Sequence, residues 1–173
     1  MKYVALTILI FLLPFQAMGM EDRYKYTADV SMDIIFGVAK ISLERKLPKK
    51  FSVVFSGGFG NDNIESNREY DIYLFSSQIN QFFTNEFSGF FTGIELERVN
   101  GNGEVFGTDS KIVNNMAGVY LGSKFVNKYG FTITSNLGVK FTYVSEKFST
   151  TQIRDYSEWQ TGLLANVKLG WSF

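Results

Sequence analysis

Charged side chains recur at alternate positions within the apolar stretches of this chain, where they could catalyse a reaction, conduct ions or neutralise one another. They are Lys25, Asp29, Asp33, Lys40, Glu44, Glu95, Glu97, Lys124, Lys140 and Lys168. The carboxylates Glu44, Glu95 and Glu97 have the chemistry of a cation path, a proton path or a catalytic pair. Structural ion-pair networks commonly mimic such functional clusters. We therefore interpret these residues as a paired network that fills an interior.

The composition excludes several kinds of site. The chain has 173 residues, of which 17 are basic and 17 acidic, with no histidine and no cysteine. It therefore lacks the usual general base at neutral pH, disulfides, thiolate metal sites and a lipid-attachment cysteine. A net charge near zero argues against nucleic-acid binding. The acidic residues of the polar segments are Asp62, Glu65, Glu104, Asp109 and Asp155. Their spacing matches no metal-binding loop motif, so we expect no metal and no cofactor.

The charged residues at alternate positions lie in segments that we predict as β-strands. The clearest of these strands covers residues 158–173. Its alternate positions are apolar, apart from one threonine: Trp159, Thr161, Leu163, Ala165, Val167, Leu169, Trp171 and Phe173. A helix would scatter these side chains around its circumference. Most strands in soluble proteins have about five or six residues. The pattern therefore predicts an unusually long strand with one apolar face.

Similar alternation predicts seven earlier strands, at residues 24–34, 39–46, 51–60, 70–83, 90–97, 113–125 and 131–143. The fourth is the least regular, because Ile72 and Leu74 lie opposite the apolar face formed by Tyr73 and Phe75. This break in the pattern suggests a bulge or a register change.

The connections alternate in length. Short turns are predicted at Pro48, Asn85 and Asn127, and longer polar loops at 60–68, 100–111 and 145–157. Only the tight turn at Phe36 and Gly37 is shorter than this pattern predicts. An even strand number with this asymmetry is typical of outer-membrane barrels. The predicted fold is therefore all-β: an eight-stranded, antiparallel, up-and-down transmembrane β-barrel whose polar interior is plugged by side chains.

Alternation alone also fits a soluble, lipocalin-like barrel, which is apolar inside and polar outside. Three features favour the membrane barrel. The strands are long enough for a tilted bilayer span, aromatic residues gather near the strand ends, and the polar face carries charges of both signs.

Residues 1–19 have the features of a cleaved signal peptide. Lys2 precedes an apolar run over residues 4–15, and Ala17 and Gly19 are small residues suited to cleavage. A run of this length is too short for a transmembrane helix. We expect residues 20–173 to form the barrel after export, as a multi-pass protein in the outer membrane of a Gram-negative-type bacterium.

Three segments carry a resemblance to known barrels: ISLERKL running into FSVVFSGGFG, then SGFFTGIELE, and the closing GLLANVKLGWSF. They resemble the small barrels of the outer membrane protein X and outer membrane protein A type, and more closely a bacterial family known only as a domain of unknown function. Val167, Leu169, Trp171 and Phe173 are similar to the terminal signal that such barrels present to the barrel-assembly machinery. The enzymes among small outer-membrane barrels use a catalytic histidine, which this chain lacks.

These observations predict a non-enzymatic outer-membrane protein with a structural, adhesion or surface-interaction role. Its expected partners are outer-membrane lipid and lipopolysaccharide, the assembly machinery, and a host or envelope ligand at the three polar loops. Lys111, Lys147 and Arg154 are candidates to meet lipopolysaccharide phosphates. The alternatives are a lipid- or lipopolysaccharide-modifying enzyme that uses serine with a carboxylate, a narrow transport channel, and a secreted soluble barrel that binds a hydrophobic ligand.

Overall fold

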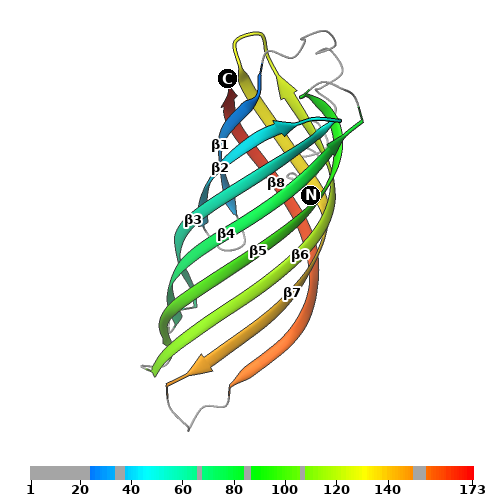
Figure 1. Ribbon diagram of the computed structural model, residues 1–173. Coiled ribbons are helices and arrows are strands. Elements are labelled where there is room, and N and C mark those ends of the chain that lie inside the picture. The colour runs from blue at the N-terminus through cyan, green and yellow to red at the C-terminus, as the bar shows by residue number, and fades with distance from the viewer. Residues whose placement is uncertain (1–23, 34–37, 66–67, 84–86, 106–107, 150–154) are drawn as a thin grey trace, which may run out of the picture.

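In a computed structural model, the chain forms one closed antiparallel sheet of eight strands, as predicted (Figure 1). The structure describes residues 24–33, 38–65, 68–83, 87–105, 108–149 and 155–173. The strands are β1 (Tyr26–Asp33), β2 (Val38–Leu47), β3 (Phe51–Glu65), β4 (Arg68–Phe82), β5 (Gly89–Val105), β6 (Thr108–Val126), β7 (Phe131–Phe148) and β8 (Tyr156–Ser172). The predicted leader and the predicted turns at Phe36 and Asn85 lie outside the described residues. Over the described ranges, the chain has no helix long and apolar enough to cross a membrane.

Each strand pairs with its neighbours in the chain, and β1 closes the sheet against β8. The stagger of the barrel can be measured by stepping from each residue to its pairing partner on the next strand. A path that starts at Trp159 on β8 passes through Tyr143, Arg98 and Val30 and arrives back on β8 at Leu169. The path returns to β8 ten residues away from its start (169 − 159). This stagger requires strands that tilt by roughly 35–45° against the barrel axis.

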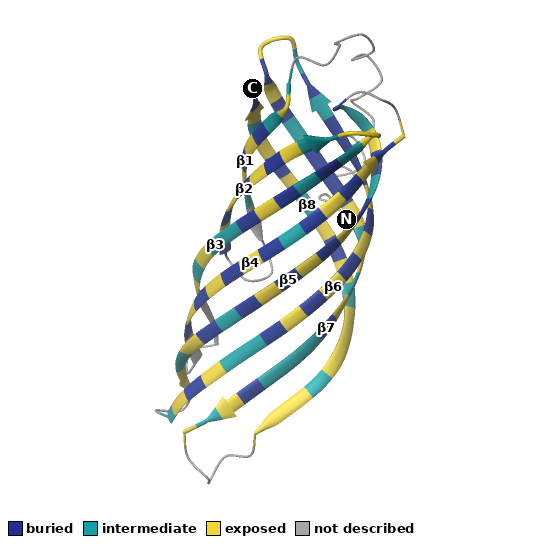
Figure 2. Cartoon of the chain, viewed as in Figure 1, coloured by how far each residue is buried: buried dark blue, intermediate teal, exposed yellow. Residues whose placement is uncertain are grey.

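Buried and exposed residues alternate along the strands, as the alternation of polar and apolar residues in the sequence predicts (Figure 2). In β2, buried and exposed residues alternate strictly from Val38 to Arg45. Large apolar side chains cover the outer surface, among them Ile41, Phe55, Phe75, Leu96, Val119, Leu163 and Trp171. The buried side is largely polar.

Two segments predicted as loops, 60–68 and 100–111, are largely strand, and the third, 145–157, is strand over 145–148 and 156–157. β3 and β4 together leave only residues 66–67 between them, and β5 and β6 leave only 106–107. Polar, glycine- and asparagine-rich sequence is typical of turns. Here the same residues continue the backbone pairing, as Asn102 does opposite Lys111. The strands therefore continue as paired hairpins at the end where long loops were predicted. The difference between the two ends lies mainly in how far the strands extend.

The bulge or register change predicted at Ile72 and Leu74 is wrong, because β3 and β4 pair in one register from Tyr70 to Gln81. Their register shifts outside this stretch, between Asp62 and Glu65 of β3. The pairing of β4 with β5 runs without interruption from Arg68 to Phe82. Ile72 and Leu74 are buried because they line the barrel interior, where they pack with Val99 and Met116. The apolar residues on both faces therefore reflect an apolar interior patch and not a change of register.

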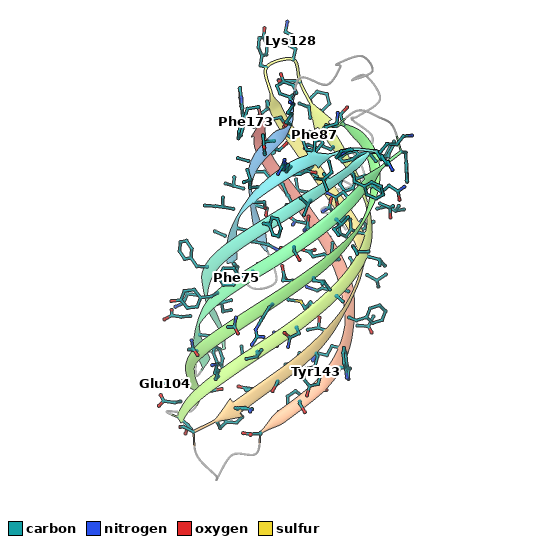
Figure 3. All side chains as sticks on the ribbon, in the orientation of Figure 1. Phe75, Phe87, Glu104, Lys128, Tyr143 and Phe173 are labelled. Carbon is teal, nitrogen blue, oxygen red and sulfur yellow. The ribbon has the colours of Figure 1, made fainter. Side chains whose placement is uncertain are left out.

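The interior has one apolar cluster toward each end. The hairpin end is where β3–β4, β5–β6 and β7–β8 turn, and its cluster contains Val38, Tyr70, Ile72, Leu74, Val99 and Met116. The terminal end holds the C-terminus and the turn at Lys128, and its cluster contains Phe82, Phe87, Phe91, Tyr120 and Leu164. Phe87 lies at the same end of the barrel as Phe173 and Lys128, and Glu104 lies at the other end (Figure 3). The charged residues occupy the interior between and beside these clusters.

Candidate functional site

The tightest part of the interior network surrounds Glu44 near the terminal end. Lys124 Nζ lies 2.6 Å from Glu44 Oε2 and donates a second hydrogen bond of 2.7 Å to Thr27 Oγ1. The other carboxylate oxygen accepts hydrogen bonds from Ser52 Oγ at 2.5 Å and Asn80 Nδ2 at 3.3 Å. Both charges are buried. Such a pair is stable only when its remaining donors and acceptors are satisfied, as they are here.

Aromatic side chains cover this ion pair. The Lys124 ammonium lies 3.4 Å from the centre of the Phe87 ring, a cation–π contact. Tyr120 donates a hydrogen bond of 2.6 Å to Asn80 Oδ1 and packs edge-on against Phe91. The terminal end of the interior is therefore filled with rings above a neutralised pair.

A second network crosses the middle of the barrel from β8 to β2. Lys168 Nζ donates to Gln78 Oε1 at 3.0 Å, and Gln78 Nε2 donates to Glu95 Oε1 at 2.7 Å. Lys40 lies 3.8 Å from Glu95 and forms a shorter ion pair with Glu97. The carboxylates proposed as a cation or proton path are thus bound to a lysine and an amide. We interpret them as plug residues.

A third network at the hairpin end was missed by the sequence analysis. The Tyr70 hydroxyl donates to Glu146 Oε1 at 2.6 Å, and Ser110 Oγ lies 3.1 Å from the same oxygen. All three residues are buried. Glu146 falls within a segment that was predicted as a loop, although it has the same parity as the inward-facing Thr142. Continuing the alternation of β7 by four residues would have identified it.

The structure places most of the ten predicted network residues inside the barrel. The buried ones are Asp29, Lys40, Glu44, Glu95, Glu97, Lys124 and Lys168. Lys140 is half-buried. Lys25 has the inward parity but is exposed, because it precedes β1 at the rim, where no wall encloses it. The side chain of Asp33 lies outside the described part.

A cavity of about 210 Å³ adjoins the central network. Its lining includes Lys40, Glu95, Glu97, Lys140 and Asn166. The volume suffices for several water molecules among these polar groups. Over the described residues, no group of three or more histidine, cysteine, aspartate or glutamate side chains is arranged to hold a metal ion.

β8 closes the barrel by pairing with β1 from Thr27 to Ser31, and Phe173, the residue after β8, extends this contact. Phe173 N donates to Tyr26 O at 2.9 Å, while Phe173 O accepts from the backbone of Lys25 and Tyr26. The Phe173 and Tyr26 rings stack at 6.0 Å between centroids. The predicted assembly-signal residues all lie on the exposed face: Val167, Leu169, Trp171 and Phe173.

The charged residues of the predicted loops lie mostly on paired strands. Glu104 is opposite Asp109, and Lys111 is opposite Lys147, all four exposed. Asp155 accepts a hydrogen bond of 3.2 Å from the backbone of Phe148.

The side chains of Asp62 and Glu65, and the whole of Arg154, lie outside the described part. The structure thus brings six of the predicted interior residues together in two hydrogen-bonded groups: Lys124 with Glu44, and Lys40, Glu95, Glu97 and Lys168 through Gln78. Asp29 is buried too, but its Oδ1 has no hydrogen-bond partner among the described residues. No family model, curated protein or solved structure matches this chain in comparisons with known proteins.

Proposed function

We propose that this chain is a non-enzymatic, integral outer-membrane β-barrel with a structural or surface-interaction role. The observation that carries this proposal is the polarity of the wall: apolar side chains point out and charges point in. Ile41, Phe55 and Trp159 are 67%, 63% and 73% exposed, whereas Glu44 and Lys124 are 3% and 1% exposed.

This polarity fits a hydrocarbon solvent. Apolar surface that stays in water costs a free energy of about 25 cal/mol per Å². Soluble monomers rarely expose large contiguous apolar patches. A closed sheet also leaves no unpaired edge, which is a requirement for strands that cross a bilayer. A soluble barrel that binds a hydrophobic ligand would need the reverse arrangement.

The hairpin end supports a surface role. On the outer face of β5, apolar Ile94 and Leu96 are followed by Arg98, Asn100 and Asn102. This change marks the edge of the apolar belt, beyond which β5 continues in polar form. The paired hairpins offer a rigid polar surface to a host or envelope ligand, with the terminal end facing the periplasm.

The interior argues for structure and against catalysis or transport. Glu44, Glu95 and Glu97 are each held by a lysine, and apolar clusters lie toward both ends. An eight-stranded barrel has an interior just wide enough for its side chains. We therefore expect little ion conductance and no lipid-modifying activity.

Folding of residues 20–173 tests the proposal. The chain is diluted from urea into phospholipid vesicles, into detergent or into plain buffer, and is followed by circular dichroism and by gel migration with and without heating. We expect a β-rich, heat-modifiable species only with lipid or detergent. A folded protein in plain buffer would contradict the membrane proposal and would support a soluble barrel.

A further inference from the structure

The outer wall of β3, β4 and β5 contains a groove among otherwise bulky residues. Two small residues, Gly57 on β3 and Ser77 on β4, lie between large apolar neighbours; Ser77 is directly opposite Phe55 and Leu96. A β-carbon added to Gly57 would meet no atom within 4 Å. The groove is open to its surroundings and has a volume of about 520 Å³.

A cation lies at one end of this groove. Arg98 lines it and is directly opposite Phe75 on β4 and Asn115 on β6. Its Nε donates to Asn100 Oδ1 at 3.2 Å, which orients the guanidinium toward the hairpin end. The diagonal neighbours Tyr73, Ser77, Val113 and Ala117 are uncharged. The remaining guanidinium N–H groups suit the planar, bidentate recognition of a phosphate.

We propose that this groove binds an anionic, phosphate-bearing lipid of the surrounding leaflet, with the phosphate at Arg98 and an acyl chain along Phe55, Ser77 and Leu96. The inference rests on the proposed membrane location. On the outer face of β5, Arg98 is the first charged residue after apolar Ile94 and Leu96, where a lipid headgroup would meet its chains. The charge selects an anionic headgroup, and the small side chain of Ser77 leaves space for the chain between Phe55 and Leu96.

The test uses the full barrel, folded in vesicles, with a tryptophan at the groove. The reporter protein carries Phe75→Trp together with Trp159→Phe and Trp171→Phe. Its fluorescence is quenched with brominated phosphatidylglycerol or brominated phosphatidylcholine as the probe. We expect phosphatidylglycerol to be preferred roughly two- to five-fold at this site, as for a partly exposed charge pair. A protein with only Trp171 retained should show no preference.

Two variants of the reporter separate the charge from the groove. Arg98→Gln removes the cation, and Ser77→Leu fills the groove while Arg98 remains. Both should abolish the preference for phosphatidylglycerol. Arg45→Gln is the matched control, because Arg45 faces outward at the terminal end beside Tyr26 and should leave the preference unchanged.

The outcomes distinguish this inference from the membrane proposal. Equal quenching by the two lipids in a heat-modifiable barrel, or a preference that survives Arg98→Gln, would overturn the lipid site alone. A reporter that neither lipid quenches, with no heat-modifiable form, would overturn the membrane location and the site together.

Discussion

Lys124 and Glu44 form a buried ion pair of 2.6 Å although they are separated by 80 residues in the chain. β6 supplies the lysine and β2 the carboxylate, so these two strands face each other across the barrel interior. The pair joins strands on opposite sides of the closed sheet, and its partners Thr27 and Ser52 come from β1 and β3. It is therefore a sensitive reporter of closure.

Lys124→Met should destabilise the folded barrel by about 3–5 kcal/mol, because it leaves the buried Glu44 carboxylate without its cation. The double variant Lys124→Met/Glu44→Gln should recover much of this loss. Urea unfolding in vesicles measures both, and Lys25→Met at the exposed rim is the control. A single variant as stable as the unmodified protein would show that the pair is not buried as described.

Val139→Lys should cost about 2–4 kcal/mol when the barrel is folded in lipid, because Val139 points outward from the apolar part of β7. Ser145→Lys, on the same strand and face but beyond the apolar belt, should be nearly neutral. Urea unfolding in vesicles compares the two. Equal stabilities would contradict the proposed lipid-facing side.

Gly138→Ala should destabilise the barrel by about 1–3 kcal/mol through overpacking. A β-carbon at this position would lie 2.0 Å from the carbonyl oxygen of Val119 and 2.6 Å from Tyr120 Cα, both of which are backbone atoms of β6. Gly57→Ala is the matched control, since its β-carbon meets open space. Thermal unfolding should rank the two variants in this order, and the reverse order would disprove the close approach of β6 and β7.

Tyr70→Phe should cost about 1–3 kcal/mol, because Glu146 loses a buried donor. The effect should concentrate at the hairpin end, where Tyr70 joins β4 to β7. Amide hydrogen exchange in the folded barrel should show faster exchange at Asn102 and Lys111 than in the unmodified protein. Fast exchange at these two amides even in the unmodified protein would contradict the paired hairpins.

Deletion of Phe173 should impair both unassisted folding in vesicles and assembly in cells, because it removes backbone hydrogen bonds that join β8 to β1. Phe173→Ala keeps the backbone and should fold in vesicles. A defect of Phe173→Ala in cells alone would identify the ring as the signal for the assembly machinery. Normal insertion of the deletion variant would count against a closing role.

The sequence by itself determined which face of each strand each side chain occupies, because side chains alternate with period two whatever the partner strand. It therefore predicted the eight antiparallel strands and the inward position of Glu44, Glu95 and Lys168. It did not predict the ends of the strands, since polar residues form turns in one context and paired strands in another.

Only the tertiary structure decided which inward residues meet. Their pairing depends on register and on the ten-residue stagger at closure, which bring Tyr70 to Glu146 and Lys40 to Glu97 across the barrel. Apolar Ile72 and Leu74 broke the expected pattern because the interior is not uniformly polar. The sequence of one strand cannot show which side chains of the opposite wall its inward residues will meet. The groove at Ser77 likewise forms only when three strands lie side by side.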